Sequence, residues 1–359
     1  MQIITKKSFL MYQADPVRYH RIPGIVVTAR GTILLYWEMR SGASDWLCDG
    51  IGLLRSEDCG ETWSEIRTIA VSHDSSPLNN PVMIACRDGR VIFLWEEAYC
   101  RGYVSVSTDD GISFSFASEI TENIKSFRAN TGYQWDVFAF GPGHGTELSD
   151  GRLIVPVWFA NGGPHAHMPS VVSTAVSSDG GKTWKTGELI GDRKEFVNPN
   201  ETCLFQKENG DVVLNIRHTG KTHYRAVSVS RDGLRSFSEP VFDRQLPDPV
   251  CFGSAVKSPV PFHGAKPVLF SNCATMPCPE NHYSRRRENL SLRLSLDDGK
   301  TWAYTRQLEN YGGYSDVAFS PDGQWIYCFY EQDIDSLRYT EPRYLTFARL
   351  NFNWLIDTP

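Results

Sequence analysis

Residues 56–63 read SEDCGETW, and this short pattern decides the fold class because it is repeated along the chain. In the general form S-x-D-x-G-x-[ST]-[WF] it returns at Ser107–Phe114, Ser177–Trp184 and Ser295–Trp302, with a looser copy at Ser230–Phe237. Successive copies start 51, 70, 53 and 65 residues apart, so each belongs to a unit large enough to form a small sheet. Self-similarity at a long period is typical of propellers and solenoids.

A second repeat runs in phase with the first. A turn glycine precedes an apolar run at Gly31, Gly89, Gly151, Gly210, Gly264 and Gly323. The runs are rich in β-branched and aromatic residues and are expected to be strands, as at Val91–Trp95, Leu153–Trp158, Val212–Ile216 and Trp325–Tyr330. No long stretch has helical periodicity. The sequence therefore predicts an all-β fold, a six-bladed β-propeller with about 60 residues per blade.

One domain is expected to span residues 1–359, because six such units use the whole chain. The sixth unit has a turn at Asp322 and Gly323 but lacks the Ser/Asp motif, so we expect the two chain ends to share that blade. Within the motif, the Asp side chain should accept backbone N–H groups, Gly should supply a positive φ, and the aromatic residue should pack under the next strand.

Composition excludes several classes of function. The net charge of −6 argues against a nucleic-acid partner. No apolar run approaches the ~20 residues of a membrane span, and residues 1–10 show no signal peptide. Nine scattered cysteines favour free thiols in a reducing compartment, so a cytoplasmic location is expected. Cys273 and Cys278 lie close in sequence, but no further ligands complete a zinc site, and neither a metal nor a cofactor is expected.

The residues that break the repeat are the candidates for chemistry. Four arginines lie beside apolar strands, at Arg21, Arg40, Arg217 and Arg287. Buried guanidinium groups need partners, and a converging set of them forms a clamp for one carboxylate, since each fork binds it bidentately. Asp45, Glu201 and Tyr314 accompany them in neighbouring loops and strand ends.

Taken in order, these residues resemble those of an exo-sialidase of the bacterial and cytosolic animal type. The resemblance covers essentially the whole chain, and the repeated motifs are similar to that family's Asp boxes. Arg21 in Arg-Ile-Pro, Arg217 in Leu-Asn-Ile-Arg and Arg287 match the carboxylate-binding triad, with Arg285 and Arg286 as neighbours of the third position.

The resemblance also implies roles for the other candidates. Asp45 matches the acid/base residue, Glu201 the group that activates the nucleophile, and Tyr314 the nucleophile itself. Glu331 in Phe-Tyr-Glu looks like the glutamate that supports the first arginine, and Arg40 is placed among the substrate-binding residues. The implied activity is removal of a terminal α-linked sialic acid from a glycan, with retention of configuration through a tyrosine nucleophile.

Two alternatives remain at this stage. The arginines read only a carboxylate, so the substrate could be a related 2-keto-3-deoxy sugar acid, either a deaminated sialic acid or a shorter ulosonic acid. A propeller that binds an acidic glycan without cleaving it is the other. Trp46, Trp135, His144, His165 and His167 are candidates for the pocket walls, with the loop 160–170 foremost. The linkage preference and the oligomeric state do not follow from the sequence.

Overall fold

The computed structural model describes residues 4–10, 19–72, 74–276, 286–332 and 342–357. The regular secondary structure of the described chain is mostly β-strand, as the sequence predicts, and its strands form five hydrogen-bonded sheets. The first sheet contains β2 (Tyr19–Val27), β3 (Ile33–Arg40), β4 (Cys48–Ser56) and β5 (Arg67–Val71). The second contains β11 (Gly143–His144), β6 (Leu78–Ala85), β7 (Val91–Glu97), β8 (Arg101–Ser107) and β9 (Ser118–Glu119).

The next two sheets follow the same plan. In the third, β10 (Val137–Phe140), β13 (Leu153–Ala160), β14 (Ser170–Ser177) and β15 (Lys185–Thr186) lie in order, and β12 (Thr146–Glu147) also pairs with β13. In the fourth, β16 (Thr202–Gln206), β17 (Val212–Ile216), β18 (Tyr224–Ser230) and β19 (Val241–Pro247) form an antiparallel meander.

The fifth sheet has seven strands and contains both ends of the described chain. Its order is β1 (Ile4–Leu10), β25 (Tyr344–Asn351), β24 (Trp325–Gln332), β23 (Tyr304–Phe319), β22 (Glu288–Ser295), β21 (Val268–Cys273) and β20 (Ser254–Lys257). The long strand β23 changes partner midway, because residues 304–311 pair with β22 and residues 312–319 pair with β24. The expected sharing of a sheet by the two chain ends is confirmed, since β1 pairs with β25.

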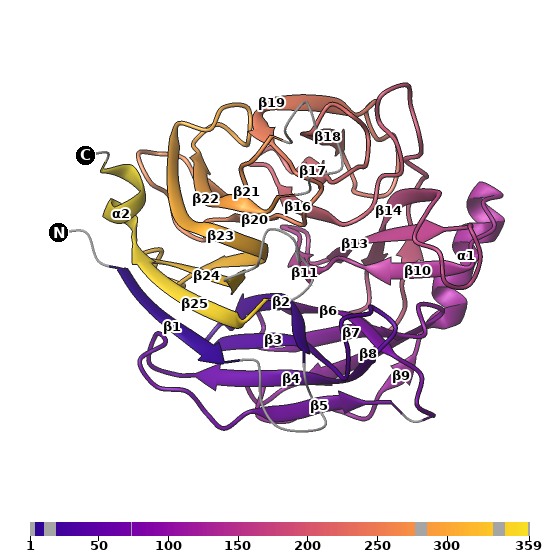
Figure 1. Ribbon diagram of the computed structural model, residues 1–359, viewed down its shortest axis with the longest axis horizontal. Helices are drawn as coiled ribbons and strands as arrows, with labels where there is room; N and C mark the ends of the chain where they lie inside the picture. The colour runs from indigo at the N-terminus through magenta and orange to yellow at the C-terminus, as the bar shows by residue number, and fades with distance from the viewer. Residues whose placement is uncertain (1–3, 11–18, 73, 277–285, 333–341, 358–359) are drawn as a thin grey trace.

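The sheets are arranged around a common centre, with β2, β6, β11, β16 and β20 nearest to it (Figure 1). The six turn glycines all have positive φ and occupy turns ahead of β3, β7, β13, β17, β21 and β24. The four predicted strand runs lie within β7, β13, β17 and β24. Blade-like sheets packed in this way bury their faces against one another.

The repeated motif forms the turn that the sequence predicts. Asp58 accepts the backbone N–H of Thr62 at 2.9 Å and its hydroxyl at 2.6 Å, while Ser56 Oγ accepts the N–H of Gly60 at 2.8 Å. Hydrogen bonds from Thr62 lower the pKa of Asp58 to about 2. Equivalent bonds recur at Asp109, Asp179 and Asp297, and Asp232 in the looser copy accepts two backbone N–H groups.

Each motif glycine also allows its turn to pack closely against a side chain of the preceding sheet. A Cβ at Gly111 would lie 2.8 Å from Leu34 on β3, and one at Gly60 would lie 2.4 Å from Phe347 on β25. The corresponding neighbours of the other copies are Ile92 for Gly181, Ile154 for Gly233 and Phe205 for Gly299. The motif therefore joins neighbouring sheets, and the contact between Gly60 and Phe347 joins the first sheet to the last.

Two helices interrupt the strands: α1 (Thr121–Thr131) and the single-turn α2 (Phe352–Ile356). Helix α1 is not predicted by the sequence pattern, because Ile124 and Phe127 are the apolar side chains that it buries and two residues make no periodic stripe. Among the described residues, neither helix is long and apolar enough to cross a membrane.

Candidate active site

A cavity of about 220 Å³ lies where several strands and loops end near the centre of the molecule. Its walls include six of the residues that the sequence singles out: Arg21, Asp45, Glu201, Arg217, Arg287 and Tyr314. These residues come from parts of the chain up to 293 positions apart, from Arg21 to Tyr314. The fold therefore brings the predicted set together.

Three guanidinium groups converge on the ring of Tyr314. The Cζ atoms of Arg21, Arg217 and Arg287 lie 5.4, 5.9 and 4.8 Å from the ring centroid. All three arginines are buried, yet each lines the cavity. Three cations around one small cavity form a site for an anion, and the planar guanidinium fork suits a carboxylate in particular.

The hydroxyl of Tyr314 lies between a base and a cation. It donates a 2.5 Å hydrogen bond to Glu201 Oε1 and accepts one of 2.8 Å from Arg217 Nη1. Arg217 Nη1 also pairs with Glu201 Oε2. A carboxylate in contact with a phenol can take its proton, and an adjacent guanidinium stabilises the phenolate that remains.

Glu331 contacts two of these arginines and the backbone of Tyr314. Its fully buried carboxylate accepts Arg21 Nε at 2.5 Å on one oxygen and the backbone N–H of Tyr314 at 3.0 Å on the other. Arg287 Nη1 lies 3.9 Å from the second oxygen. One side chain thus lies against two of the arginines and the backbone of Tyr314, and the supporting role of Glu331 stays a prediction.

Irregularities in the inner strands direct these side chains into the cavity. The pairing of β2 with β3 shifts between Arg21 and Gly24, where Ile22 has a φ of +61°. The pairing of β23 with β24 shifts between Gly312 and Ser315, on either side of Tyr314. Bulges of this kind re-aim side chains at the ends of strands.

Asp45 also lines the cavity, in the loop between β3 and β4. Arg40 Nη1 donates to Asp45 Oδ1 at 2.7 Å, and Asn79 Nδ2 donates to the Asp45 carbonyl at 2.8 Å. Burial opposes ionisation, but the guanidinium of Arg40, followed by that of Arg21, outweighs burial and lowers the pKa of Asp45. The Asp45 side chain remains 42% exposed, so it can reach a bound molecule.

Arg40 differs from the other three arginines, because it is fully buried and does not line the cavity. Its guanidinium contacts Glu38 and Asp45. A direct contact between Arg40 and substrate thus stays a prediction, whereas its contact with Asp45 is direct. Arg286 has a 60% exposed side chain and lies outside the cavity lining, and Arg285 lies outside the described residues.

The candidate wall residues divide into two groups. His167 lines the cavity with Tyr99 and Trp158, and its Nδ1 lies 3.9 Å from Asp45 Oδ2. Trp46 and His165 are not among the lining residues; their rings meet edge to face with centroids 4.5 Å apart, and the Trp46 ring lies 5.9 Å from that of His167. Trp135 and His144 do not line this cavity: Trp135 packs in the core against Phe138, and His144 pairs with the buried Asp316. Tyr99, Trp158 and Asn200 line the site without a prior signal, because nothing in their local sequence distinguishes them from core residues.

Comparison with known proteins agrees with this geometry. Residues 67–327 match the model of the "BNR repeat-like domain" family, which is more than half of the chain. The chain belongs to the BNR repeat-like domain family. It is 27% identical over 366 residues to a sialidase of Micromonospora viridifaciens, which covers 94% of this chain and 52% of that protein. It is 28% identical over 351 residues to a sialidase of Bacteroides fragilis, with 88% and 60% covered.

Among solved structures, too, this BNR repeat-like chain resembles a sialidase. A Hadza microbial sialidase, Hz136, superposes with a TM-score of 0.79 at 25% identity, over 97% of this chain and 69% of that one. The resemblance to sialidases found in the sequence is thus confirmed. The chain spans 52% and 60% of the length of the two curated bacterial relatives.

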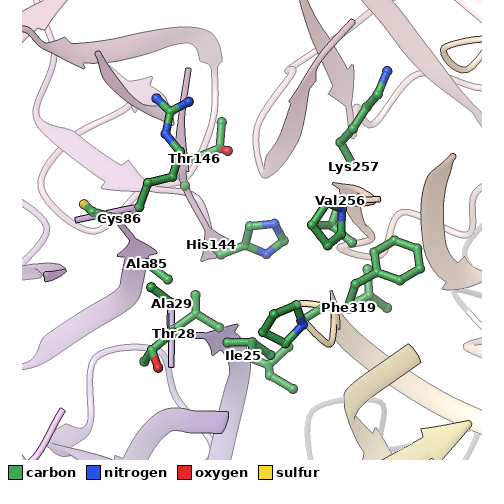
Figure 2. Close-up of a pocket in the computed structure, with 18 residues that line it drawn as sticks. Ile25, Thr28, Ala29, Ala85, Cys86, His144, Thr146, Val256, Lys257 and Phe319 are labelled. Carbon is green, nitrogen blue, oxygen red and sulfur yellow. The ribbon is translucent and has the colours of Figure 1, made fainter. Parts of the chain in front are cut away.

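A larger cavity of about 370 Å³ lies around His144, with side chains of several sheets pointing into it (Figure 2). Its walls are mostly apolar, and its charged residues are paired: His144 with Asp316, Arg87 with Glu147, and Lys257 with Asp298. No tyrosine and only one arginine line it, whereas three arginines and the Glu201 carboxylate surround Tyr314 in the smaller cavity. The smaller cavity is therefore the candidate active site of this BNR repeat-like protein.

The described residues contain no group of three or more His, Cys, Asp or Glu side chains arranged to hold a metal ion. Eight of the nine cysteines are described, and all eight are free thiols; Cys278 lies outside the described residues. The expected absence of a metal and the expected cytoplasmic location stay predictions.

Proposed function

We propose that the chain is a retaining exo-sialidase built on a single six-bladed propeller. Counting β23 as a member of two blades divides the described strands into six groups, which supports that blade number. The function rests on one observation above all: three guanidinium groups surround Tyr314, whose hydroxyl is bonded to Glu201. The likeness to bacterial sialidases supports the same substrate class.

In the proposed reaction, Arg21, Arg217 and Arg287 hold the carboxylate that a sialic acid carries on its anomeric carbon. Tyr314 Oη attacks that carbon while Glu201 takes the phenolic proton, and Asp45 protonates the departing glycosidic oxygen. A neutral phenol suits this attack, because an anionic nucleophile would be repelled by the substrate's own carboxylate. Acid assistance of this kind contributes about 10²–10⁴ in rate.

The second half returns every group to its starting state. Asp45, now ionised, takes a proton from water, and the resulting nucleophile attacks the anomeric carbon. The bond to Tyr314 breaks, and Glu201 gives the proton back to the phenolate. Two displacements at one carbon leave its configuration unchanged.

A fluorogenic aryl sialoside tests the activity, and proton NMR of sialyllactose hydrolysis tests the stereochemistry. We expect turnover, with the α-anomer of the free sugar appearing first and mutarotating later. Folded protein that gives no turnover between pH 4 and pH 8 would contradict the proposal. First release of the β-anomer would instead contradict the tyrosine-linked intermediate.

The nature of the sugar acid requires a separate comparison. A panel of aryl glycosides of sialic acid, of deaminated sialic acid and of a shorter ulosonic acid, measured as kcat/KM, decides among them. We expect sialic acid to be preferred. Binding of the unsaturated sialic acid analogue without turnover of any of the three would favour the non-catalytic glycan-binding alternative.

A further inference from the structure

A buried ionic chain lies behind Asp45. Glu38 and Arg40 are two residues apart on β3, so their side chains share one face of the strand. Both are fully buried. Arg40 Nε and Nη2 lie 2.6 and 2.5 Å from Glu38 Oε2, and Arg40 Nη1 donates to Asp45 Oδ1 at 2.7 Å. One guanidinium is therefore shared by two carboxylates, one of them fully buried and the other exposed to the cavity.

Burial raises the pKa of Glu38, but its contacts with Arg40 and with the backbone of Asn80 oppose that effect and favour the ionised carboxylate. Its Oε2 faces the guanidinium, and its Oε1 accepts the backbone N–H of Asn80 at 2.7 Å. Both oxygens therefore face hydrogen-bond donors, as an ionised carboxylate requires. The negative charge of Glu38 offsets the positive charge of Arg40 at a position that water does not reach.

Among the buried groups around Arg40, Glu38 is the main counter-charge to the Arg40 guanidinium. Tyr99 and Cys48 also face Arg40, but burial raises the pKa of both far above the usual values, so both are neutral. Arg21 and His167 face Asp45, and burial lowers the pKa of His167.

Glu96 is the other acid near Glu38. It is fully buried, and burial raises its pKa well above the usual value, which favours its neutral form. Glu38 and Asp45 thus share the charge of Arg40 between them.

We infer that Glu38 is a positioning residue of the active site: it neutralises the guanidinium that holds Asp45, so that Asp45 is fixed in place and can still carry a proton. The inference rests on the proposed function, in which Asp45 acts first as an acid and then as a base. A guanidinium alone would fix Asp45 equally well, but it would hold the carboxylate in its ionised form. The buried counter-charge therefore limits how far Arg40 lowers the pKa of Asp45.

Titration of Asp45 tests the inference without any need for turnover. The Asp45 carboxyl carbon is followed by ¹³C NMR against pH in the wild type and in Glu38→Gln, with Asp45→Asn to assign the signal. The glutamine keeps the shape and an acceptor but removes the charge. We expect the Asp45 pKa to fall by about one unit, since Arg40 then acts on Asp45 alone. An unchanged or higher pKa would overturn the inference, whether or not the protein is a sialidase.

Kinetics then connect the charge to the reaction. With sialyllactose, whose leaving group needs protonation, the alkaline limb of kcat/KM in Glu38→Gln should move to lower pH by the same amount. With an aryl sialoside, whose leaving group departs unprotonated, the limb should move much less. Glu38→Asp, which keeps the charge, should restore the wild-type limb. Equal losses on both substrates without a shifted limb would show a merely structural role and overturn the inference.

A second variant, which should shift the Asp45 pKa in the opposite direction, keeps the inference testable if Glu38→Gln does not fold. Arg40→Gln removes the cation, so the Asp45 pKa should rise rather than fall; a fall would contradict the inference. Asp248→Asn is the matched control, because Asp248 forms a buried pair with Arg225 at 2.9 Å away from the cavity lining. It should lose stability in thermal unfolding and leave the Asp45 titration unchanged.

Discussion

Tyr314 combines several roles in one side chain, because its ring lies among three arginines and its hydroxyl lies between Glu201 and Arg217. In Tyr314→Phe the ring and its packing remain, while the oxygen that we propose as the nucleophile is lost. We expect kcat on an aryl sialoside to fall by on the order of 10³-fold or more. The thermal unfolding temperature should stay within a few degrees of the wild type. Full activity in this variant would exclude the tyrosine as nucleophile.

Asp45 makes the reaction depend on pH. Arg40 outweighs the effect of burial and lowers the Asp45 pKa, so the unliganded site loses this proton at a lower pH than an ordinary aspartate would. The acid form is present below that pKa and is lost as pH rises. We therefore expect kcat/KM for sialyllactose to fall about tenfold per pH unit on the alkaline side. A rate that rose from pH 5 to pH 7 would contradict Asp45 as the proton donor.

Substitution of Asp45 separates the two kinds of substrate. Asp45→Asn should reduce hydrolysis of sialyllactose by about 10²–10⁴-fold, and the first step on an aryl sialoside much less. Burst-phase measurements with the aryl substrate, in which the first turnover is resolved, provide the check. Equal losses in the first step on both substrates would assign the residue to binding instead.

The sequence predicts the residues that line the cavity more completely than it predicts the buried residues that hold them in place. Arg21, Asp45, Glu201, Arg217, Arg287 and Tyr314 are polar groups that interrupt apolar patterns, and all six line the cavity. Glu38 lies inside a strand of otherwise mostly apolar residues and carries no motif, so its contact with Arg40 is visible only in three dimensions. The sequence also does not predict that Arg40 is fully buried and lies outside the cavity lining, unlike Arg21, Arg217 and Arg287.

Among the elements, the repeated motif turns offer a direct measure of packing between sheets. Gly111 and Gly151 have similar positive φ values of 77° and 88°. A Cβ at Gly111 would lie 2.8 Å from Leu34, whereas one at Gly151 would meet nothing within 4 Å. Both alanine variants carry backbone strain, but Gly111→Ala adds a clash, so we expect it to lower the free energy of unfolding by about 1–3 kcal/mol more. Denaturant unfolding measures the difference. Equal free energies of unfolding for the two variants would mean that the turn at Gly111 does not pack tightly against the neighbouring sheet.

Strand prediction succeeds here because two independent repeats mark the same turns. The motif Asp and Gly residues and the turn glycines fix both the hairpins and the runs between them, and these runs are the observed strands. Helix α1 is missed because its stability comes from tertiary burial of Ile124 and Phe127 rather than from a periodic pattern. The change of partner along β23 is equally invisible, since neither half differs in composition from an ordinary strand.

For the molecule as a whole, the pairing of β1 with β25 ties the two ends of the described chain into one sheet. Phe9 on β1 packs against Trp63 with ring centroids 5.7 Å apart, and Lys6 Nζ lies 3.1 Å from Glu309. Deletion of residues 1–10 should lower the thermal unfolding temperature by roughly 5 °C or more, because it exposes the edge of β25 and the ring of Trp63. A synthetic peptide with the sequence of residues 1–10 should restore part of the loss. An unchanged unfolding temperature would show that the ring does not need this strand.

The same pairing constrains how the protein is made. During translation β1 (Ile4–Leu10) is made long before its neighbour β25 (Tyr344–Asn351), because the other strands lie between them in the sequence. Glu331, which anchors both Arg21 and the Tyr314 backbone, also arrives late. The nascent chain must therefore carry an open edge strand and an unassembled candidate site until β24 and β25 have been made, which makes shielding by a chaperone most valuable before these two strands appear.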